Sequence, residues 1–320
     1  YYEPDEARLR KSGVAEIDEN ERAITSLPMH YVYGLSVINT HLWAGARLLL
    51  TEQNCYAKQF WALFDGEGAT SFAGVPFMYE MLDKLKITAK RPLPTLKTMT
   101  QAGGKLLPSL QSKFSQYAHE TGRKFVVMYG ASEATARMGY LPSDMAVKKE
   151  GSMGIPIPGG RFELIDENGA VIETPDTEGE LVYYGENVTL GYSEKGEDLA
   201  KGDENHGRLS TGDMARRDAD GYYYITGRKK RFVKILGKRL NLDELERMLK
   251  KDCDSVDIAC AGKDDDLRIF LVDDSLREAV ERFVFEKTNV NRALFHIIHI
   301  DEIPKNAAGK ILYSALNNLE

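Results

Sequence analysis

The segment VMYGASEAT, residues 127 to 135, brings together an aromatic ring, a hydroxyl and a carboxylate at the end of a buried strand. In open α/β sheets, ligands collect outside the carboxyl ends of the strands, where glycine turns expose backbone N–H groups. Tyr129 could stack on a flat heterocycle, Ser132 offers a small hydroxyl, and Glu133 could hold a hard cation such as Mg²⁺ through oxygen. The same pattern is also typical of an ordinary strand end followed by a helix cap.

A second candidate pair is a carboxylate and a guanidinium, Asp213 and Arg228, which lie fifteen residues apart on either side of a glycine-turned hairpin. A carboxylate accepts hydrogen bonds and a guanidinium donates them, so together they could bind the hydroxyls of a ribose. The alternative is a surface salt bridge across the hairpin, which would contribute little to stability.

Two further side chains could act on an anion or on a proton. Lys310 follows a Pro-to-Gly loop in IPKNAAGKILYSAL, residues 303 to 316, and a lysine at a loop tip supplies a compact, mobile positive charge. His30, in LPMHYVYG, could be a gate or a base. The ordinary alternatives are a solvated lysine and a histidine that packs beside Tyr31 and Tyr33.

The elements that must position these residues change character twice along the chain. Up to residue 130, buried strands alternate with helices, beginning with strands at 23–27 and 46–50, which predicts parallel βαβ units covered by helices. After Gly151, short strands in GRFELIDENG, GELVYYG and GYYYITG are separated by glycine turns and predict an antiparallel section.

The third section begins beyond Arg228. The pattern predicts a helix over 241–251 with leucines on one face, strands in VDIACAG and LRIFLVD, a helix in SLREAVERFVFEK and a strand in FHIIHI. Elements of this size form a separate α+β unit of about 90 residues. The predicted fold class is therefore α/β, with a parallel α/β sheet region, an antiparallel β section and a small C-terminal α+β domain.

Composition narrows the classes of function. Hydrophobic residues make up 42% and charged residues 28% of the chain, which is ordinary for a globular protein. The net charge of -7 argues against a nucleic-acid partner, although GRKKR is a local basic cluster. No apolar run is long enough for a membrane span, and three cysteines without a C-x-x-C pair indicate neither a disulfide framework nor a zinc site. A cytoplasmic protein is the default expectation.

The order of these segments resembles the AMP-forming adenylating superfamily, which includes acyl-CoA synthetases, the adenylation domains of peptide synthetases and luciferases. LPMHYVYG is similar to the family's Pro-rich acyl-pocket segment, and YGASEAT resembles its tyrosine-glycine-x-Thr-Glu motif with Ser132 in the threonine position. STGD, GRKKR, GKRLNLDELE and PKNAAGK resemble the remaining core motifs in family order. The resemblance extends over essentially the whole chain.

The resemblance implies nucleotide contacts in the first part of the chain. Tyr129 and Gly130 would bind at the adenine, while Gly103 and Gly104 of QAGGKL would let the nucleotide approach the backbone. Ser132 would contact the α-phosphate. Glu133 would hold Mg²⁺ and act in catalysis, and His30 and Tyr31 would line the acyl pocket.

The resemblance also implies roles in the last third of the chain. Asp213 and Arg228 would hold the ribose hydroxyls, and Lys310 would be the catalytic cation at the α-phosphate and the carboxylate. Lys230 would be the hinge between the C-terminal portion of a large AMP-binding domain, residues 1–229, and a small mobile domain, residues 230–320. Gly237 would lie in the loop that meets the thiol acceptor.

The implied function is an acid–thiol ligase that uses ATP to convert a small carboxylic acid into an acyl-adenylate and then transfers the acyl group to coenzyme A or a carrier-protein phosphopantetheine. LPMHYVYG lacks the aspartate that amino-acid-activating relatives use, which favours an acid without an α-amino group. The family's phosphate loop is not found between Tyr1 and Arg22. We therefore expect a fragment of a longer chain, or else a non-catalytic binder of AMP or an acyl-adenylate.

Overall fold

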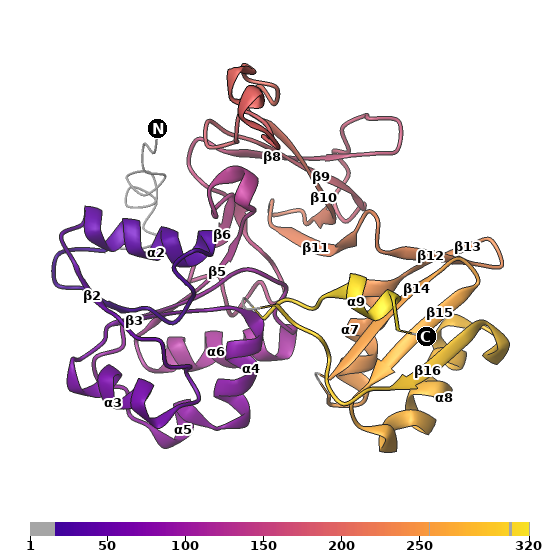
Figure 1. Ribbon diagram of the computed structural model, residues 1–320, viewed down its shortest axis with the longest axis horizontal. Helices are drawn as coiled ribbons and strands as arrows, with labels where there is room; N and C mark the ends of the chain where they lie inside the picture. Colours follow the sequence, from indigo (N-terminus) through magenta and orange to yellow (C-terminus); the bar gives the residue numbers. More distant parts are fainter. Residues whose placement is uncertain (1–16, 256, 307–308, 320) are drawn as a thin grey trace. The chain divides into compact units, whose positions relative to one another are not determined.

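The computed structural model describes residues 17–255, 257–306 and 309–319 (Figure 1). The chain divides into two compact units. Unit 1 comprises Tyr1–Thr211 and Arg216–Ile225, and unit 2 comprises Gly212–Ala215 and Thr226–Glu320. The predicted division into a large domain, residues 1–229, and a small mobile domain, residues 230–320, stays a prediction.

A seven-stranded sheet with the order β2-β1-β3-β4-β5-β6-β7 forms the centre of unit 1. The pairs from β2 to β5 are parallel, and β5–β6 and β6–β7 are antiparallel. The predicted parallel α/β region is therefore confirmed, with an antiparallel edge added after β5. The strands are β1 (Arg22–Ile24), β2 (Arg47–Leu49), β3 (Ser71–Gly74), β4 (Thr98–Gln101), β5 (Lys124–Tyr129), β6 (Gly139–Leu141) and β7 (Ile155–Pro156).

The helices of unit 1 cover the sheet on both faces. Figure 1 shows α2 on one side of the strands and α3, α4 and α6 on the other. The first two strands are shorter than the predicted ranges 23–27 and 46–50, because pairing stops where the chain turns toward a helix. The helices are α2 (Val32–Trp43), α3 (Lys58–Gly66), α4 (Pro76–Lys84), α5 (Ile87–Lys90) and α6 (Pro108–Glu120).

Aromatic side chains fill the core between the sheet and these helices. Trp61 is 6% exposed, packs on Phe60 and Phe64 at ring distances of 5.2 and 5.3 Å, and donates its indole N–H to the Cys55 carbonyl at 2.7 Å. Spacings of three and four residues put such side chains on one face of a helix. Tyr79 joins this core from α4.

A second sheet of four strands has the order β11-β10-β9-β8. The sequence pattern indicated three of these strands, and the structure adds β10, which the pattern showed only as one side of a hairpin. Residues Gly212–Ala215, in the middle of β10, belong to unit 2. The strands are β8 (Arg161–Ile165), β9 (Gly179–Tyr184), β10 (Arg208–Arg217) and β11 (Tyr223–Arg228).

Unit 2 contains a two-stranded hairpin and a three-stranded sheet. Strand β15 pairs with β14 in antiparallel and with β16 in parallel fashion. The expected small α+β section is present, and the hairpin β12–β13 is an addition. Its elements are β12 (Phe232–Ile235), β13 (Lys238–Asn241), α7 (Leu242–Asp252), β14 (Ile258–Lys263), β15 (Asp266–Leu271), α8 (Arg277–Thr288), β16 (Phe295–His299) and α9 (Tyr313–Asn317).

Helix α7 begins where the sequence pattern indicates. The Asn241 side chain accepts hydrogen bonds from the backbone N–H groups of Asp243 and Glu244 at 3.0 and 3.1 Å, and so caps the first turn. The predicted leucine face is buried against the sheet, with Leu245 and Leu249 both 0% exposed. Among the helices of the described residues, none is long and apolar enough to cross a bilayer.

Candidate functional site

The segment after β5 forms a tight loop at the carboxyl end of the last parallel strand. Tyr129 ends β5, and its ring lies edge-on to Phe162 at 6.0 Å. Residues Ser132–Ala134 form one 3₁₀ turn. A Cβ atom at Gly130 would lie 1.9 Å from the carbonyl oxygen of Ala136, so only glycine fits there. Tyr129, Gly130, Ser132 and Glu133 therefore share one loop.

The far side of this loop holds two residues in an unfavourable backbone conformation. Thr135 and Ala136 have φ angles of 55° and 72°, in the left-handed region that side chains with a Cβ atom rarely adopt. Asn187 stabilises this conformation: its amide donates to the carbonyl oxygens of Ala134 at 2.8 Å and Arg137 at 3.1 Å. The Asn187 side-chain oxygen in turn accepts a hydrogen bond from a tyrosine hydroxyl of β9.

The contact of Asn187 with this loop was not expected from the sequence. Asn187 lies in a loop after β9, and nothing in GENVTLGY indicates that it reaches back some fifty residues. Its neighbour Thr189 donates its backbone N–H to the Glu133 carbonyl at 2.7 Å. The segment 187–189 therefore holds the β5 loop from both sides.

Glu133 is half-buried and also held through its side chain. The Tyr192 hydroxyl donates to Glu133 Oε1 at 2.8 Å, and this hydrogen bond raises the pKa of Tyr192. Within residues 17–255, 257–306 and 309–319, no group of three or more His, Cys, Asp and Glu side chains could hold a metal ion. A single carboxylate suits Mg²⁺, which completes its coordination with water and substrate phosphates. Ser132 is exposed.

The glycines of QAGGKL lie after β4, the neighbour of β5. Gly103 has a φ angle of 83°, and a Cβ atom there would lie 2.4 Å from the Tyr31 hydroxyl. The structure therefore brings the predicted acyl-pocket tyrosine against a predicted nucleotide-binding glycine. Gly104 is exposed, and a Cβ atom there would meet Pro76 at 3.2 Å. Burial raises the pKa of Tyr31.

His30 lies in the turn that precedes α2, and it is exposed. Its buried counterpart is His41, near the end of the same helix, which is 4% exposed and bonds the Val37 carbonyl through Nδ1 at 2.8 Å. Burial lowers the pKa of His41 and favours its neutral form. Of the two histidines, only His30 has the exposure expected of a gate or a base.

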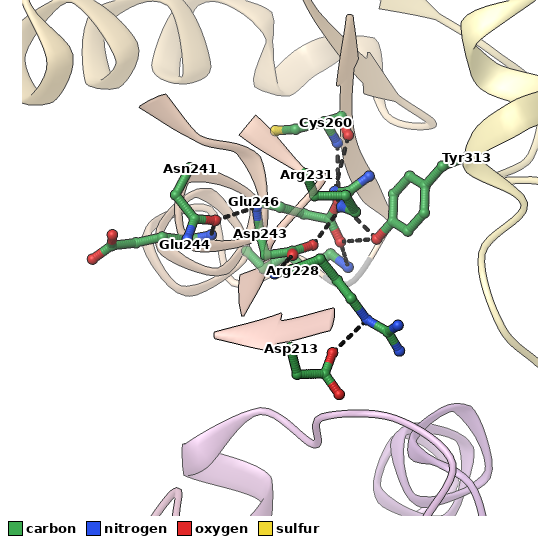
Figure 2. A network of polar contacts seen from close by, with 10 residues as sticks. Asp213, Arg228, Arg231, Asn241, Asp243, Glu244, Glu246, Cys260 and Tyr313 are labelled. Carbon is green, nitrogen blue, oxygen red and sulfur yellow. Dashed lines mark hydrogen bonds and ion pairs between the residues drawn. The ribbon is translucent and has the colours of Figure 1, made fainter. Parts of the chain in front are cut away.

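In unit 2, Asp213 and Arg228 form an ion pair (Figure 2). The distance from Asp213 Oδ1 to Arg228 Nε is 2.6 Å, and the side chains are 8% and 59% exposed respectively. The backbone N–H of Arg228 also donates to Asp243 Oδ2 at 2.8 Å. The buried carboxylate and exposed guanidinium agree with a ribose site and equally with a partly buried salt bridge.

The three remaining predicted residues of unit 2 are exposed at turns. Lys230 lies two residues after the end of β11. Gly237, with a φ angle of 78°, turns the chain between β12 and β13. Lys310 donates its backbone N–H to Asn306 Oδ1 at 3.0 Å, within a short hairpin.

A buried polar group in unit 2, which we call the Glu246 cluster, was not expected from the sequence. It comprises the side chains of Arg231, Asp243, Glu246, Lys250 and Tyr313 (Figure 2). Burial and the negative charge of Glu246 raise the pKa of Tyr313 far above its usual range, so the phenol stays protonated. Although burial disfavours the charge of Arg231, the carboxylates of Asp243 and Glu246 raise its pKa.

The sequence of this chain matches a known protein family. Residues 7–193 match the family described as "AMP-binding enzyme", which is more than half of the chain. An oxalate–CoA ligase of Arabidopsis thaliana is 26% identical over 311 residues, 93% of this chain and 59% of the relative. A 2-succinylbenzoate–CoA ligase of Bacillus mycoides is 28% identical over 306 residues, 92% of this chain and 61% of the relative.

Solved structures share the fold. The o-succinylbenzoate CoA synthetase from Bacillus subtilis, in complex with its acyl-adenylate intermediate, has a TM-score of 0.78 at 21% identity, covering 99% of this chain and 65% of that one. A benzoate CoA ligase from Burkholderia xenovorans has a TM-score of 0.73 at 22% identity, covering 98% and 65%. The chain spans about three fifths of the length of its curated relatives. From the family match and the shared fold, the chain belongs to the AMP-binding enzyme family.

Proposed function

We propose that the protein to which this chain belongs is an AMP-forming acid–thiol ligase. It uses ATP to convert a small carboxylic acid into an acyl-adenylate and then transfers the acyl group to a thiol. The observation that carries this proposal is the loop Tyr129–Glu133 at the carboxyl end of β5, in a chain that belongs to the AMP-binding enzyme family. The relatives named as CoA ligases support the reaction class.

Unit 1 supplies the adenine and phosphate contacts in this proposal. Tyr129 stacks on adenine beside Gly130, and Gly103 and Gly104 admit the nucleotide close to the backbone. Ser132, whose hydroxyl is exposed, binds the α-phosphate. Glu133 holds Mg²⁺, which when bound neutralises phosphate charge. Tyr192 supports this role because its hydroxyl fixes one oxygen of the Glu133 carboxylate.

Unit 2 supplies the ribose contacts and a movable charge. Asp213 accepts from the ribose hydroxyls and Arg228 donates to them. Lys310 lies at an exposed turn, as a residue that approaches substrate oxygens must. Lys230 is the pivot between domains 1–229 and 230–320, and Gly237 lies in the loop that faces the thiol.

The chemistry follows from charge. An acid that attacks the α-phosphate brings two anions together, so positive charge must be placed where negative charge develops. Lys310 supplies that charge during adenylation, and exclusion of water protects the adenylate from hydrolysis. The thiol then attacks the activated carbonyl and releases AMP.

The acid is proposed to lack an α-amino group, and His30 and Tyr31 line its pocket. Coenzyme A is the acceptor favoured by the names of the relatives, and a carrier-protein phosphopantetheine is the second candidate. A cytoplasmic location stays a prediction of the sequence alone.

Acid-dependent exchange of labelled pyrophosphate into ATP tests the proposal. The full-length protein is incubated with a panel of aromatic, aliphatic and dicarboxylic acids, and Glu133→Gln is the matched control because it removes the charge and keeps the shape. The ligase is supported if at least one acid gives pyrophosphate exchange and the Glu133→Gln substitution lowers that exchange. Tight AMP binding without exchange for any acid would favour the alternative, a non-catalytic binder of AMP or an acyl-adenylate.

A further inference from the structure

The backbone around Lys310 forms a compact hairpin with its own hydrogen bonds. Asn306 exchanges two bonds with Lys310: its side chain accepts from the Lys310 N–H at 3.0 Å, and its own N–H donates to the Lys310 carbonyl at 2.9 Å. Leu312 donates its N–H to the Pro304 carbonyl at 2.8 Å and closes the base. These bonds close the base of the hairpin, and how firmly they stay closed depends on how the base is attached to the rest of unit 2.

Tyr313, the first residue after this base, is its polar attachment to the rest of unit 2, beside the apolar packing of Ile303 and Leu316. Its hydroxyl donates to both carboxylate oxygens of Glu246 at 3.2 Å, as Figure 2 shows. Its ring lies under the guanidinium of Arg231, whose central carbon is 3.3 Å from the ring centroid. One tyrosine thus makes a hydrogen bond and a cation–π contact three residues from Lys310.

Both partners of Tyr313 are themselves fixed. The Glu246 side chain is 8% exposed and also accepts from Lys250 Nζ at 2.8 Å and from the Cys260 backbone N–H at 3.0 Å. Arg231 donates from Nε to Asp243 at 2.5 Å and from Nη2 to the Cys260 carbonyl at 3.1 Å. The attachment point therefore joins Arg231, the residue after Lys230, to Glu246 of α7 and Cys260 of β14.

We propose that Tyr313 is a positioning residue for Lys310, and that Glu246 and Arg231 hold it so that the lysine hairpin moves as one body with the segment after Lys230. This inference rests on the proposed function, because it gives Lys310 a reaction to serve. The phenol contributes no proton to that reaction. Its hydroxyl restricts where the hairpin base lies, and so where the lysine is presented.

Tyr313→Phe tests the attachment with little damage to the fold. The variant keeps the ring under Arg231 and leaves Glu246 with donors from Lys250, Arg231 and Cys260. Tyr224→Phe is a matched control, because the Tyr224 hydroxyl also donates to a carboxylate, that of Asp218, at 3.2 Å.

Amide hydrogen exchange measures the attachment without any need for activity. In Tyr313→Phe, the amides of Gly309, Lys310 and Leu312 should exchange at least about tenfold faster, the usual effect of one lost hydrogen bond to a charged group. Amides in the middle of α7 should stay unchanged, and Tyr224→Phe should leave the hairpin unchanged. The proposal would be overturned if these three amides exchanged at the same rate in the unsubstituted protein and in Tyr313→Phe.

A double-mutant cycle measures whether the attachment acts through Lys310. Tyr313→Phe should slow pyrophosphate exchange by up to about tenfold, hardly alter thiolysis of a supplied acyl-adenylate, and have no further effect when Lys310 is already alanine. The same loss in both backgrounds would show a structural role and overturn the proposal. If the unsubstituted protein catalyses no pyrophosphate exchange, the proposed function fails instead, and the amide exchange still decides the attachment.

Discussion

If the loop after β5 binds the nucleotide as proposed, Asn187→Ala should weaken AMP binding and stability together, because this side chain holds that loop. Its amide donates to the carbonyls of Ala134 and Arg137, which flank the two residues with positive φ. Since Asn187 is only half-buried, water can partly replace it, and each lost bond costs about 1 kcal/mol. The two bonds to the loop therefore contribute about 2 kcal/mol to the free energy of unfolding, and the bond from the Tyr183 hydroxyl, which is lost as well, adds about 1 kcal/mol.

The same energy limits the effect on binding. If the whole 2 kcal/mol is needed to keep the loop in its binding conformation, the apparent affinity for AMP falls by about 30-fold. We expect a value between about 5- and 30-fold. The Asn187 hydrogen bonds stabilise the loop both with and without AMP, so only part of their energy enters the affinity. Calorimetric titration with AMP and urea unfolding of the same preparations provide the two measurements.

Asn205→Ala is the matched control for this prediction. The Asn205 amide donates once, to the Thr189 carbonyl at 2.8 Å, in the same surface region but not to the loop itself. It should cost about 1 kcal/mol in stability and change the AMP affinity less than threefold. A variant Asn187→Ala that loses about 3 kcal/mol yet binds AMP normally would refute the reasoning, because the loop would then hold its conformation without the amide.

Three further predictions concern unit 2. Lys310→Ala should slow adenylation by about 100- to 1,000-fold and hardly change thiolysis of a supplied acyl-adenylate; similar losses in both assays would remove its assignment to one half-reaction. Asp213→Asn should weaken AMP about tenfold and leave 2′,3′-dideoxy-AMP unaffected, and equal losses for both ligands in calorimetry would contradict a ribose contact. Lys230→Pro should fix the backbone φ at the pivot and impair one half-reaction more than the other; equal impairment would count against a hinge.

The sequence predicted those features that depend on neighbours along the chain. The strand into Tyr129 with its glycine turn, the helix predicted over 241–251 and its leucine face all follow from local spacing, and the structure contains them. The end of β1 was misplaced, at 27 rather than 24: Ser26 donates its backbone N–H to the Ile24 carbonyl at 2.8 Å, so the chain already turns there.

Features that depend on tertiary packing could not be predicted in this way. Glu246 and Tyr313 are 67 residues apart, and only the packing of α9 near α7 makes them partners. Asn187 reaches Ala134 across 53 residues. The hairpin β12–β13 is short and carries charged residues at 234, 238 and 239, so its pattern resembles a solvent-exposed loop as closely as a strand pair.

The placement of the indole rings gives the protein a built-in optical probe of one unit. The chain has two tryptophans, Trp43 and Trp61, and both belong to unit 1. Trp61 is 6% exposed in the aromatic core, whereas Trp43 is 51% exposed. Iodide should therefore quench the red-shifted emission of Trp43 and spare the blue-shifted emission of Trp61. In a denaturant titration, the fluorescence wavelength then follows the melting of unit 1 alone, while circular dichroism follows both units.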